Sequence, residues 1–494
     1  MNSLLGVLGG LAIALPFLAP VWGPVAWIAF APLLWAAPRA GSYRGSLLLG
    51  LTTGMVANGL VCFWLIDTIT VFGGFPWPLA TLFYLALILY TAAPLAFLAM
   101  ALRFAGPAAP TLLAPALWVG AEFLFPNLFP WRMAHTQRDF PLLIQSADFA
   151  GPYLLSFAIV WVTASLIRPT LRRVLPPLVL VGVLLAYGQG QTQRIEAAIE
   201  SAPPLRVGLV QGNLSLFGKR DPSDLDRNLE TYRRLSETLQ PPPDLLVWPE
   251  TVVSWGIPRD RPLEAARDPY PDAPAPLLFG AVSFEKTSEG LDWYNTLFVR
   301  TLSGRLGGRY DKMVLMPFGE FLPFADQFPI IRSWSPNTGD FEAGAQAEVL
   351  ALSPSLRIGP AICYEDMLAA PLGDAAGQGA NLLISVANDA WYGESAALFL
   401  HETLGQWRAI ENRRYFLRAT NSGLTSAIDP LGRRFFSLPR AESTAGTVEA
   451  RLLGESTIYQ RFPDRFPQFV LLMALGLLGW SRAKKSRDRE YPQN

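Results

Sequence analysis

Apolar residues dominate the first 190 positions of the chain and return in one short run near its end. Between about positions 205 and 453, apolar and polar residues alternate in the patterns of strands and helices, and most of the acidic residues lie there. A last apolar run over 466–480 precedes a charged tail. Because a helix needs about 20 mostly apolar residues to cross a bilayer, this pattern predicts a membrane bundle, a globular domain and a final span.

The expected spans cover 4–20, 24–38, 46–66, 78–102, 108–126, 150–168 and 174–188, and the last covers 466–481. They predict a polytopic α-helical bundle of about eight spans with one appended α/β domain. The expected organisation is a transmembrane bundle over 1–190, a connector over 191–204, a globular domain over 205–455, a connector over 456–465, a transmembrane helix over 466–481 and a basic tail over 482–494.

Basic residues in the loops predict the orientation of the spans. The loops after the second, fourth and sixth spans, together with the tail, carry most of the arginines and lysines outside the globular domain. The opposite loops carry only Arg132 and Arg138. By the positive-inside rule both termini are cytoplasmic, and an odd number of crossings then places the globular domain in the periplasm or its equivalent.

Composition narrows the class of protein further. Of 494 residues, 51% are hydrophobic and 16% are charged, with 40 basic residues against 40 acidic residues. So much apolar sequence excludes a disordered chain, and the absence of a basic excess argues against nucleic-acid binding. Two cysteines and two histidines suggest neither a disulfide framework nor a metal site, and no cofactor is expected.

The two cysteines have different expected roles. Cys62 lies inside an expected span, where it is expected to pack as a small apolar residue. Cys363 is the only cysteine of the exported domain, so it has no partner there for a structural disulfide. An unpaired thiol in an exported domain is a candidate nucleophile.

Three candidate catalytic residues follow strand-like runs of the globular domain. Glu250 follows the run DLLVWP, Lys312 lies in RYDKMVLMPFGEFLP, and Cys363 ends LRIGPAIC. Taken singly, each also fits a structural role: a helix cap, a surface charge and a core thiol. The chain has only five lysines among its 40 basic residues, so a lysine in an apolar stretch suggests a compact ammonium that arginine could not replace.

Together these segments resemble the nitrilase superfamily, whose α-β-β-α sandwich carries a Glu-Lys-Cys triad in this order. With the spans before and after the domain, the strings YDKMVLMPFGEFLP, ICYED, NDAWYG and LRATNSGLTSAIDPLG resemble the apolipoprotein N-acyltransferase family, the membrane-embedded branch of that superfamily. The resemblance covers essentially the whole chain. It implies a multi-pass protein of the bacterial inner membrane with a periplasmic nitrilase-like catalytic domain.

The resemblance also implies a reaction and its partners. Glu250 acts as the general base, Lys312 stabilises the oxyanion, and Cys363 forms a thioester with an acyl group from a phospholipid. Phosphatidylethanolamine is the expected donor, the N-terminal diacylglyceryl-cysteine of an apolipoprotein is the acceptor, and no cofactor is needed. Further positions that the resemblance marks as supporting the site are Glu320, Tyr364 and Glu365, with Asn388, Asp389 and Trp391 shaping a loop beside the thiol.

Several polar residues outside the triad have a structural and a functional interpretation. His401 suggests a Cys–His hydrolase, but its helical surroundings favour an ordinary helical histidine. Asp67 and Glu122 lie in expected spans and are therefore site candidates, with Glu122 expected to form interhelical hydrogen bonds. Gly6 and Gly10 have the spacing of a helix-packing motif.

Two alternative functions remain open from the sequence. The first is a membrane-anchored nitrilase-type amidase that hydrolyses a C–N bond with the same triad. The many spans argue against it, because one span would anchor a hydrolase. The second is a transporter or lipid-binding protein with an inactive domain, which the intact triad and the lack of a visible inverted repeat disfavour.

Overall fold

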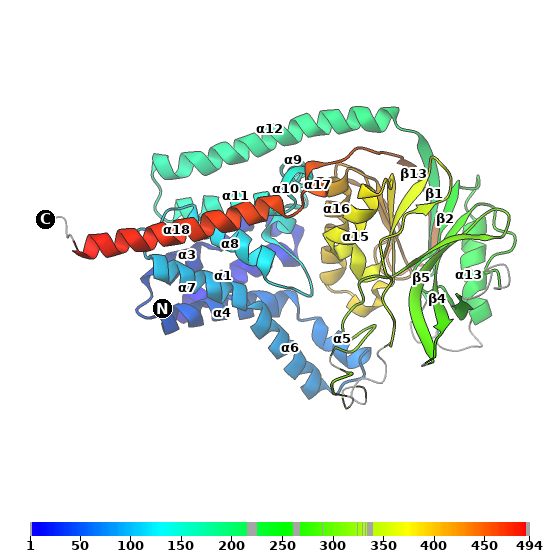
Figure 1. Cartoon of the computed structure of the whole chain (residues 1–494), viewed down its shortest axis with the longest axis horizontal. Coiled ribbons are helices and arrows are strands. Elements are labelled where there is room, and N and C mark those ends of the chain that lie inside the picture. The colour runs from blue at the N-terminus through cyan, green and yellow to red at the C-terminus, as the bar shows by residue number, and fades with distance from the viewer. Residues whose placement is uncertain are drawn as a thin grey trace. The chain divides into compact units, whose positions relative to one another are not determined.

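The computed structural model describes residues 2–214, 225–259, 267–288, 290–323, 325–328, 330, 332 and 339–490. The chain forms two compact units (Figure 1). The helical unit comprises Met1–Ile66, Trp77–Gln193 and Arg461–Asn494, and the sheet unit comprises Asp67–Pro76 and Arg194–Gln460.

Helices occupy all eight segments in which the apolar pattern predicts spans. In chain order the principal helices are α1 (Asn2–Leu18), α2 (Ala26–Ala29), α3 (Ala31–Ala36), α4 (Tyr43–Val61), α5 (Leu65–Val71), α6 (Trp77–Thr91), α7 (Ala93–Ala105), α8 (Leu113–Leu124), α11 (Tyr153–Leu166), α12 (Leu171–Ser201) and α18 (Arg465–Glu490). Short helices α9 (Pro141–Ile144) and α10 (Ala147–Ala150) precede α11.

Not every helix is long enough to span a bilayer by itself. Within the described part of the chain, four helical stretches are long and apolar enough to cross a membrane. A fifth is added if the bent pair of α4 and α5 forms one span. The four are Pro20–Arg39, Trp77–Ala105, Leu171–Ser201 and Arg465–Lys484. Three further apolar helices have 10–17 residues. The fold therefore fits a membrane protein, whereas the expected number of about eight spans stays a prediction.

Helix ends differ from the expected boundaries at both connectors. Helix α12 continues to Ser201, so most of the expected connector 191–204 is helical. Its sequence QTQRIEAAIE consists largely of residues that favour helices. Helix α17 (Ile458–Arg461) lies in the expected connector 456–465. Helix α18 extends through much of the expected tail, whose residues 491–494 lie outside the described residues.

The expected packing motif of Gly6 and Gly10 is confirmed. Helix α1 packs along α4 so closely that a Cβ atom at Gly10 would lie 2.7 Å from the carbonyl oxygen of Thr53. A Cβ atom at Gly6 would lie 3.0 Å from Cβ of Thr52. The small residues thus permit the close approach of two helix backbones.

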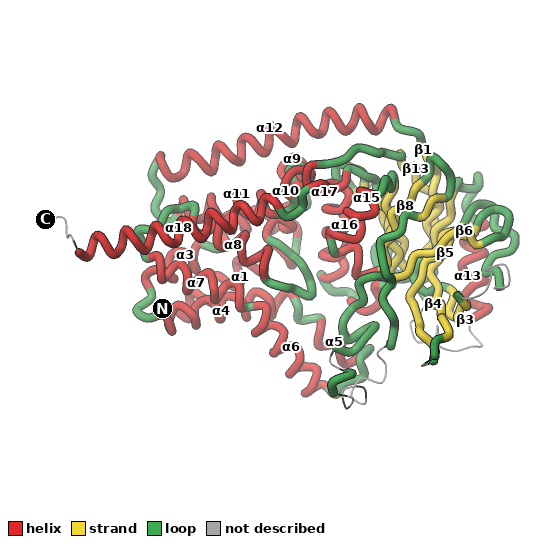
Figure 2. The backbone as a smooth tube through the Cα atoms, in the orientation of Figure 1, coloured by secondary structure: helices red, strands yellow, loops and turns green. Residues whose placement is uncertain are grey.

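Two β-sheets form the sheet unit (Figure 2). The first has the strand order β13-β1-β2-β4-β5-β6, with β3 paired to β4, and the second has the order β12-β11-β10-β9-β8-β7. The strands are β1 (Pro204–Gln211), β2 (Leu245–Val247), β3 (Val253–Pro258), β4 (Leu277–Lys286), β5 (Leu291–Arg300), β6 (Leu306–Asp311), β7 (Leu350–Ala351), β8 (Arg357–Ile362), β9 (Leu382–Ala387), β10 (Phe416–Thr420), β11 (Ser426–Ile428), β12 (Arg434–Ser437) and β13 (Thr444–Arg451).

Successive side chains of a strand point to opposite faces of its sheet, so the two sheets contribute to three hydrophobic layers. Leu245 and Val247 of β2 and Ile384 of β9 belong to one buried cluster shared by both sheets. Leu246 of β2 lies in the cluster that includes helix α13 (Leu225–Glu237), and Leu383 of β9 lies in the cluster that includes α15 (Ala369–Gly377) and α16 (Ala397–Asn412). Helices therefore cover the outer faces of both sheets, which confirms the expected α-β-β-α sandwich.

Candidate active site

Strand directions bring the three candidate catalytic residues to one edge of the sandwich. Strand β2 is parallel to β4, and β6 runs in the same direction because two antiparallel pairings separate it from β4. Glu250 and Lys312 follow the carboxyl ends of β2 and β6, respectively. Cys363 follows the carboxyl end of β8 in the second sheet. The two carboxylates of Glu250 and Glu320 and the ammonium of Lys312 all act electrostatically on the Cys363 thiol, so these groups are neighbours.

The amide of Asn295 links the two carboxylates of the site. Its Nδ2 donates hydrogen bonds to Oε1 of Glu250 at 2.8 Å and to Oε1 of Glu320 at 2.9 Å. The main-chain carbonyl oxygen of Asn295 accepts a hydrogen bond from the backbone N–H of Lys312 at 2.9 Å. Asn295 lies in the middle of β5, is 3% exposed, and thus positions both carboxylates from a rigid strand.

Lys312 is buried and paired with Glu320. Its side chain is 1% exposed, and its Nζ lies 2.6 Å from Oε2 of Glu320. Burial opposes the charge of this ammonium, but the carboxylates of Glu320 and Glu250 favour it, and the pKa of Lys312 is raised. The side chain therefore stays protonated at neutral pH and can stabilise a developing negative charge. Glu320 also accepts from the N–H of Met316 at 2.8 Å, which fixes its orientation.

Cys363 lies on a strained turn between β8 and a short 3₁₀ helix, η7 (Cys363–Met367). Its φ angle is +52°, a conformation that residues other than glycine rarely adopt and that is concentrated at functional sites. Burial and the carboxylate of Glu250 raise the pKa of the Cys363 thiol, while Lys312 lowers it. The resting thiol is therefore protonated, and a base has to remove its proton when it attacks.

Glu365 connects the turn of Cys363 with the loop that follows Lys312. Its Oε2 accepts from the N–H of Ile362 at 2.8 Å, and its Oε1 accepts from the N–H of Met313 at 2.7 Å. The Tyr310 hydroxyl and the N–H of Val314 also donate to Oε1. Glu365 is fully buried, so the expected supporting residue holds two backbone segments together.

Tyr364 and Asn388 lie beside these groups. Tyr364 directly follows Cys363, and burial raises the pKa of its hydroxyl to about 12. Asn388 is 3% exposed and follows the end of β9, which is parallel to β8, the strand that Cys363 follows. Its Oδ1 accepts from Nδ2 of Asn421 at 3.3 Å and from the hydroxyl of Ser422 at 3.4 Å.

Trp391 contacts residues of the segment 67–76, which lies between two expected spans in the sequence. The hydroxyl of Thr68 donates to the carbonyl oxygen of Trp391 at 2.7 Å. The ring of Phe72 lies 4.7 Å from the Trp391 ring, measured between centroids. Residues 67–76 thus belong to the sheet unit, although the hydropathy pattern alone groups them with the bundle. Asp67, at the start of this segment, is exposed.

Sequence reasoning did not identify Asn295 and Arg418 as site residues. Asn295 is a buried amide inside a strand, and Arg418 is a fully buried arginine in the apolar strand β10. A polar residue in the middle of an otherwise apolar strand is the signal that could have indicated both. His401 is fully buried, with both ring nitrogens bonded within a cluster of charged residues, an arrangement different from a Cys–His catalytic pair.

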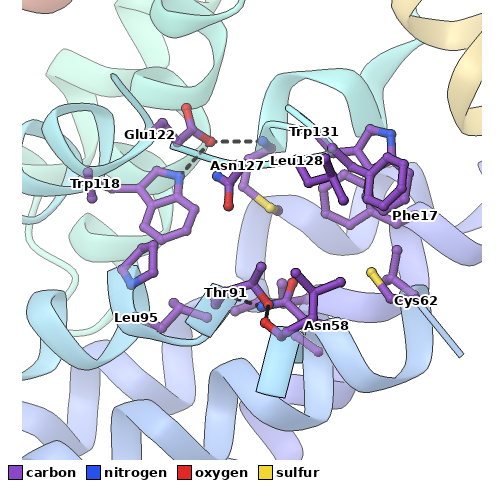
Figure 3. A pocket seen from close by; sticks show the side chains of 18 residues that line it. Phe17, Asn58, Cys62, Thr91, Leu95, Trp118, Glu122, Asn127, Leu128 and Trp131 are labelled. Carbon is purple, nitrogen blue, oxygen red and sulfur yellow. Dashed lines mark hydrogen bonds between the residues drawn. The ribbon is translucent and has the colours of Figure 1, made fainter. Parts of the chain in front are cut away.

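The helical unit contains a cavity of about 100 Å³ (Figure 3). Mostly apolar side chains line it, and Glu122 of α8 is the acidic residue among them. Its Oε1 accepts from Nε1 of Trp118 at 2.9 Å, the N–H of Met133 at 3.0 Å and the hydroxyl of Ser156 at 3.2 Å. Because Ser156 lies in α11, the expected interhelical hydrogen bond of Glu122 is confirmed.

Comparisons with known proteins agree with this architecture. Residues 206–453 match the carbon-nitrogen hydrolase family, and residues 9–165 match the apolipoprotein N-acyltransferase N-terminal domain. Among solved structures, the chain is similar to Saccharomyces cerevisiae Nit3, a member of branch 10 of the nitrilase superfamily, with 17% identity and a TM-score of 0.39. That similarity covers 53% of this chain and 94% of the other. The family match over residues 206–453 shows that the sheet unit carries a carbon-nitrogen hydrolase domain.

Similarity over the whole chain defines the family. The chain is 34% identical to the apolipoprotein N-acyltransferase of Geobacter metallireducens over 487 residues, which cover 94% of this chain and 92% of the relative. It is 33% identical to that of Azotobacter vinelandii over 489 residues, which cover 95% and 92%. The chain therefore belongs to the apolipoprotein N-acyltransferase family and is an acyltransferase.

Proposed function

We propose that Cys363 takes an acyl group from a phospholipid as a thioester and passes it to the N-terminal amine of a diacylglyceryl-cysteine apolipoprotein. Phosphatidylethanolamine is the proposed donor. The observation that carries this proposal is the set of groups around the Cys363 thiol: Glu250, Lys312 and Glu320, joined by Asn295. A base, a buried cation and a nucleophile on a strained turn are what acyl transfer requires.

In the first half-reaction, Glu250 removes the proton of the Cys363 thiol as sulfur attacks the ester carbonyl of the donor. Lys312 and the backbone N–H of Tyr364 stabilise the negative oxygen of the tetrahedral intermediate. The C–O ester bond then breaks, and the lysophospholipid alcohol leaves with the proton from Glu250. An acyl thioester on Cys363 remains.

In the second half-reaction, Glu250 accepts a proton from the α-amino group of the acceptor as its nitrogen attacks the thioester. The C–S bond breaks, and the sulfur recovers a proton from Glu250. The product is an amide, the N-acylated lipoprotein. The reaction differs from that of an amidase in that water is excluded from the thioester, so the amine attacks it instead of water.

The membrane arrangement is proposed from the loop charges. About eight spans in the inner membrane, with both termini cytoplasmic, place the catalytic domain in the periplasm. The donor and the acceptor both keep their lipid chains in the bilayer, so a chain that carries both a membrane bundle and a catalytic domain suits both substrates. A soluble hydrolase would need no such bundle.

Intact-mass measurement of the purified full-length protein tests the reaction. After incubation with phosphatidylethanolamine, we expect the mass to increase by one fatty-acyl group in the wild type and to stay unchanged in Cys363→Ala. A diacylglyceryl peptide with a free amine should remove the group and appear as its N-acyl derivative. An adduct that water removes equally fast without the peptide would instead establish a hydrolase.

A further inference from the structure

Four charged side chains form a buried cluster behind the turn of Cys363. We call Asp366, Asp389, His401 and Arg418 the charge cluster; each is at most 1% exposed. They come from four elements: η7, the 3₁₀ helix η8 (Asp389–Tyr392), α16 and β10. Asp366 lies three residues after the nucleophile, and Asp389 acts electrostatically on the Cys363 thiol.

Arg418 contacts both carboxylates of the charge cluster. Its Nη1 and Nη2 donate to Asp389 at 2.6 and 3.0 Å, and its Nε donates to Oδ2 of Asp366 at 3.1 Å. The hydroxyl of Ser385 donates to the same Oδ2 at 2.6 Å. The Asp389 carboxylate packs against Gly423, where a Cβ atom would lie 2.5 Å from Oδ2, so a larger residue there would displace it.

His401 lies between the same two carboxylates. Its Nε2 is 2.5 Å from Oδ1 of Asp366, and its Nδ1 is 3.2 Å from Oδ1 of Asp389. The ring of Tyr392 packs edge-on against the imidazole, with 5.6 Å between centroids. Asp366, Asp389 and Arg418 act electrostatically on His401.

The charge balance decides the protonation state of His401. Two carboxylates and one guanidinium leave one negative charge without a counter-charge in a fully buried site, which is costly. The Nδ1 of a neutral imidazole could accept a hydrogen bond from Nη2 of Arg418, which lies 2.8 Å away. The extra negative charge of the cluster would then remain without a counter-charge. An imidazolium donates to both carboxylates and makes the charge cluster neutral.

We infer that His401 is a charged positioning residue: its imidazolium neutralises Asp366 and Asp389 and so limits the negative potential at Cys363. Burial and Arg418 lower the proton affinity of His401, yet both carboxylates outweigh them and raise its pKa. The pKa values of Asp366 and Asp389 are lowered, because the charges of Arg418 and His401 outweigh their burial. The inference rests on the proposed role of Cys363, but not on the identity of either substrate.

Histidine NMR tests the charge of His401 directly, because the chain has only two histidines. The other is His135, whose Nδ1 accepts from the N–H of Arg132 at 2.9 Å and is therefore unprotonated. In ¹⁵N-histidine-labelled full-length protein at pH 7.5 in detergent, we expect one imidazolium with two protonated nitrogens and one neutral ring. A His135→Gln variant assigns the signals. Two neutral rings would overturn the inference, whether or not the protein transfers acyl groups.

Thiol reactivity tests the consequence for Cys363. In a Cys62→Ala background, we expect His401→Gln to slow alkylation of Cys363 about tenfold at neutral pH and to move its pH–rate profile to higher pH. Ser385→Ala, which removes an uncharged hydrogen bond to Asp366, should leave that profile in place. Superimposable profiles of wild type and His401→Gln would contradict the electrostatic role. If His401→Gln does not fold, the NMR result on the wild-type protein decides.

Discussion

The buried Lys312 and the partly exposed Glu320 form an ion pair with 2.6 Å between Nζ and Oε2. The eight-residue separation spans a loop, so the pair also closes the segment MVLMPFG against the end of β6. The N–H of Met316 donates to the same Oε2, and thus the lysine and the loop share one anchor. In the proposed mechanism this ammonium stabilises the oxyanion that forms beside Cys363, so its position should matter as much as its charge.

Lys312→Arg should therefore inactivate the enzyme despite keeping the charge. The planar guanidinium is larger than an ammonium, and a lysine that is 1% exposed leaves no room for it. We expect kcat to fall about 100-fold or more, as on loss of one oxyanion donor, with a smaller change in KM. Steady-state acyl transfer to a diacylglyceryl peptide measures this. Lys286→Arg, an exposed position on β4, is the control; wild-type activity of Lys312→Arg would contradict the role.

Asn295→Asp should move the acid limb of the pH–rate profile to higher pH. The new carboxylate would lie within hydrogen-bond distance of both Glu250 and Glu320. Like charges this close favour protonation of one of them, so the base is neutralised at a pH where the wild type is active. The kcat/KM of Asn295→Asp should be low at pH 7 and recover partly toward pH 9. Asn295→Ala, which adds no charge, should show a smaller displacement, and an equal displacement would exclude this explanation.

Glu365→Gln should destabilise the sheet unit and disorder the site. Four donors converge on the Glu365 carboxylate, and a glutamine would direct its own N–H groups at some of them. One buried donor left without an acceptor costs about 1–3 kcal/mol. We expect a lower unfolding temperature and slower acylation together. Glu348→Gln, at an exposed position, serves as the control and should change neither.

The strand-end residues were predictable from sequence because local pattern encodes them. Glu250 and Cys363 each follow a buried strand, and the parallel pairs β2–β4 and β8–β9 bring such positions to one edge of each sheet. Asn295 was not predictable in this way, since its partners Glu250 and Glu320 lie 45 and 25 positions away. Hydrogen bonds between residues so far apart in the chain depend on the order of strands in the sheet, which cannot be read from a single sequence.

The same limit applies to His401 and to the membrane bundle. A helical pattern correctly placed His401 in α16, but its partner Asp366 lies 35 positions earlier. Helices occupy every segment in which hydropathy predicts a span, yet hydropathy could not show that residues 67–76 pack with the sheet unit. Apolar composition indicates that a segment is buried away from water, but it does not indicate which part of the protein or membrane the segment packs against.

Glu122→Ala should destabilise the helical unit more than Glu122→Gln. Oε1 of Glu122 accepts three hydrogen bonds, one of them from Ser156 on another helix. Glutamine retains a carbonyl acceptor at that position, whereas alanine leaves three donors without it and enlarges the adjoining cavity. Unfolding temperatures in detergent measure both variants. Equal losses would mean that the carboxylate charge, and not its acceptor role, stabilises the bundle.

The stability of the sheet unit should depend on pH through His401, with a defined sign. The pKa of His401 is higher in the folded protein than its unfolded value of about 6.5. Its contribution to stability is therefore complete below that pH and is lost as the pH rises through the folded-state pKa. For Asp366 and Asp389, whose pKa values are lowered, the contribution is present above about pH 4 and is lost as the pH falls through their folded-state pKa values.

The stability difference between wild type and His401→Gln should accordingly be largest between about pH 4 and pH 6.5 and shrink toward alkaline pH. Each tenfold gain in proton affinity on folding corresponds to about 1.4 kcal/mol, so a small rise in pKa is measurable. Denaturant unfolding of both proteins from pH 5 to pH 10 gives the difference. A difference that grows with pH would reverse the sign and show that the folded protein prefers a neutral His401.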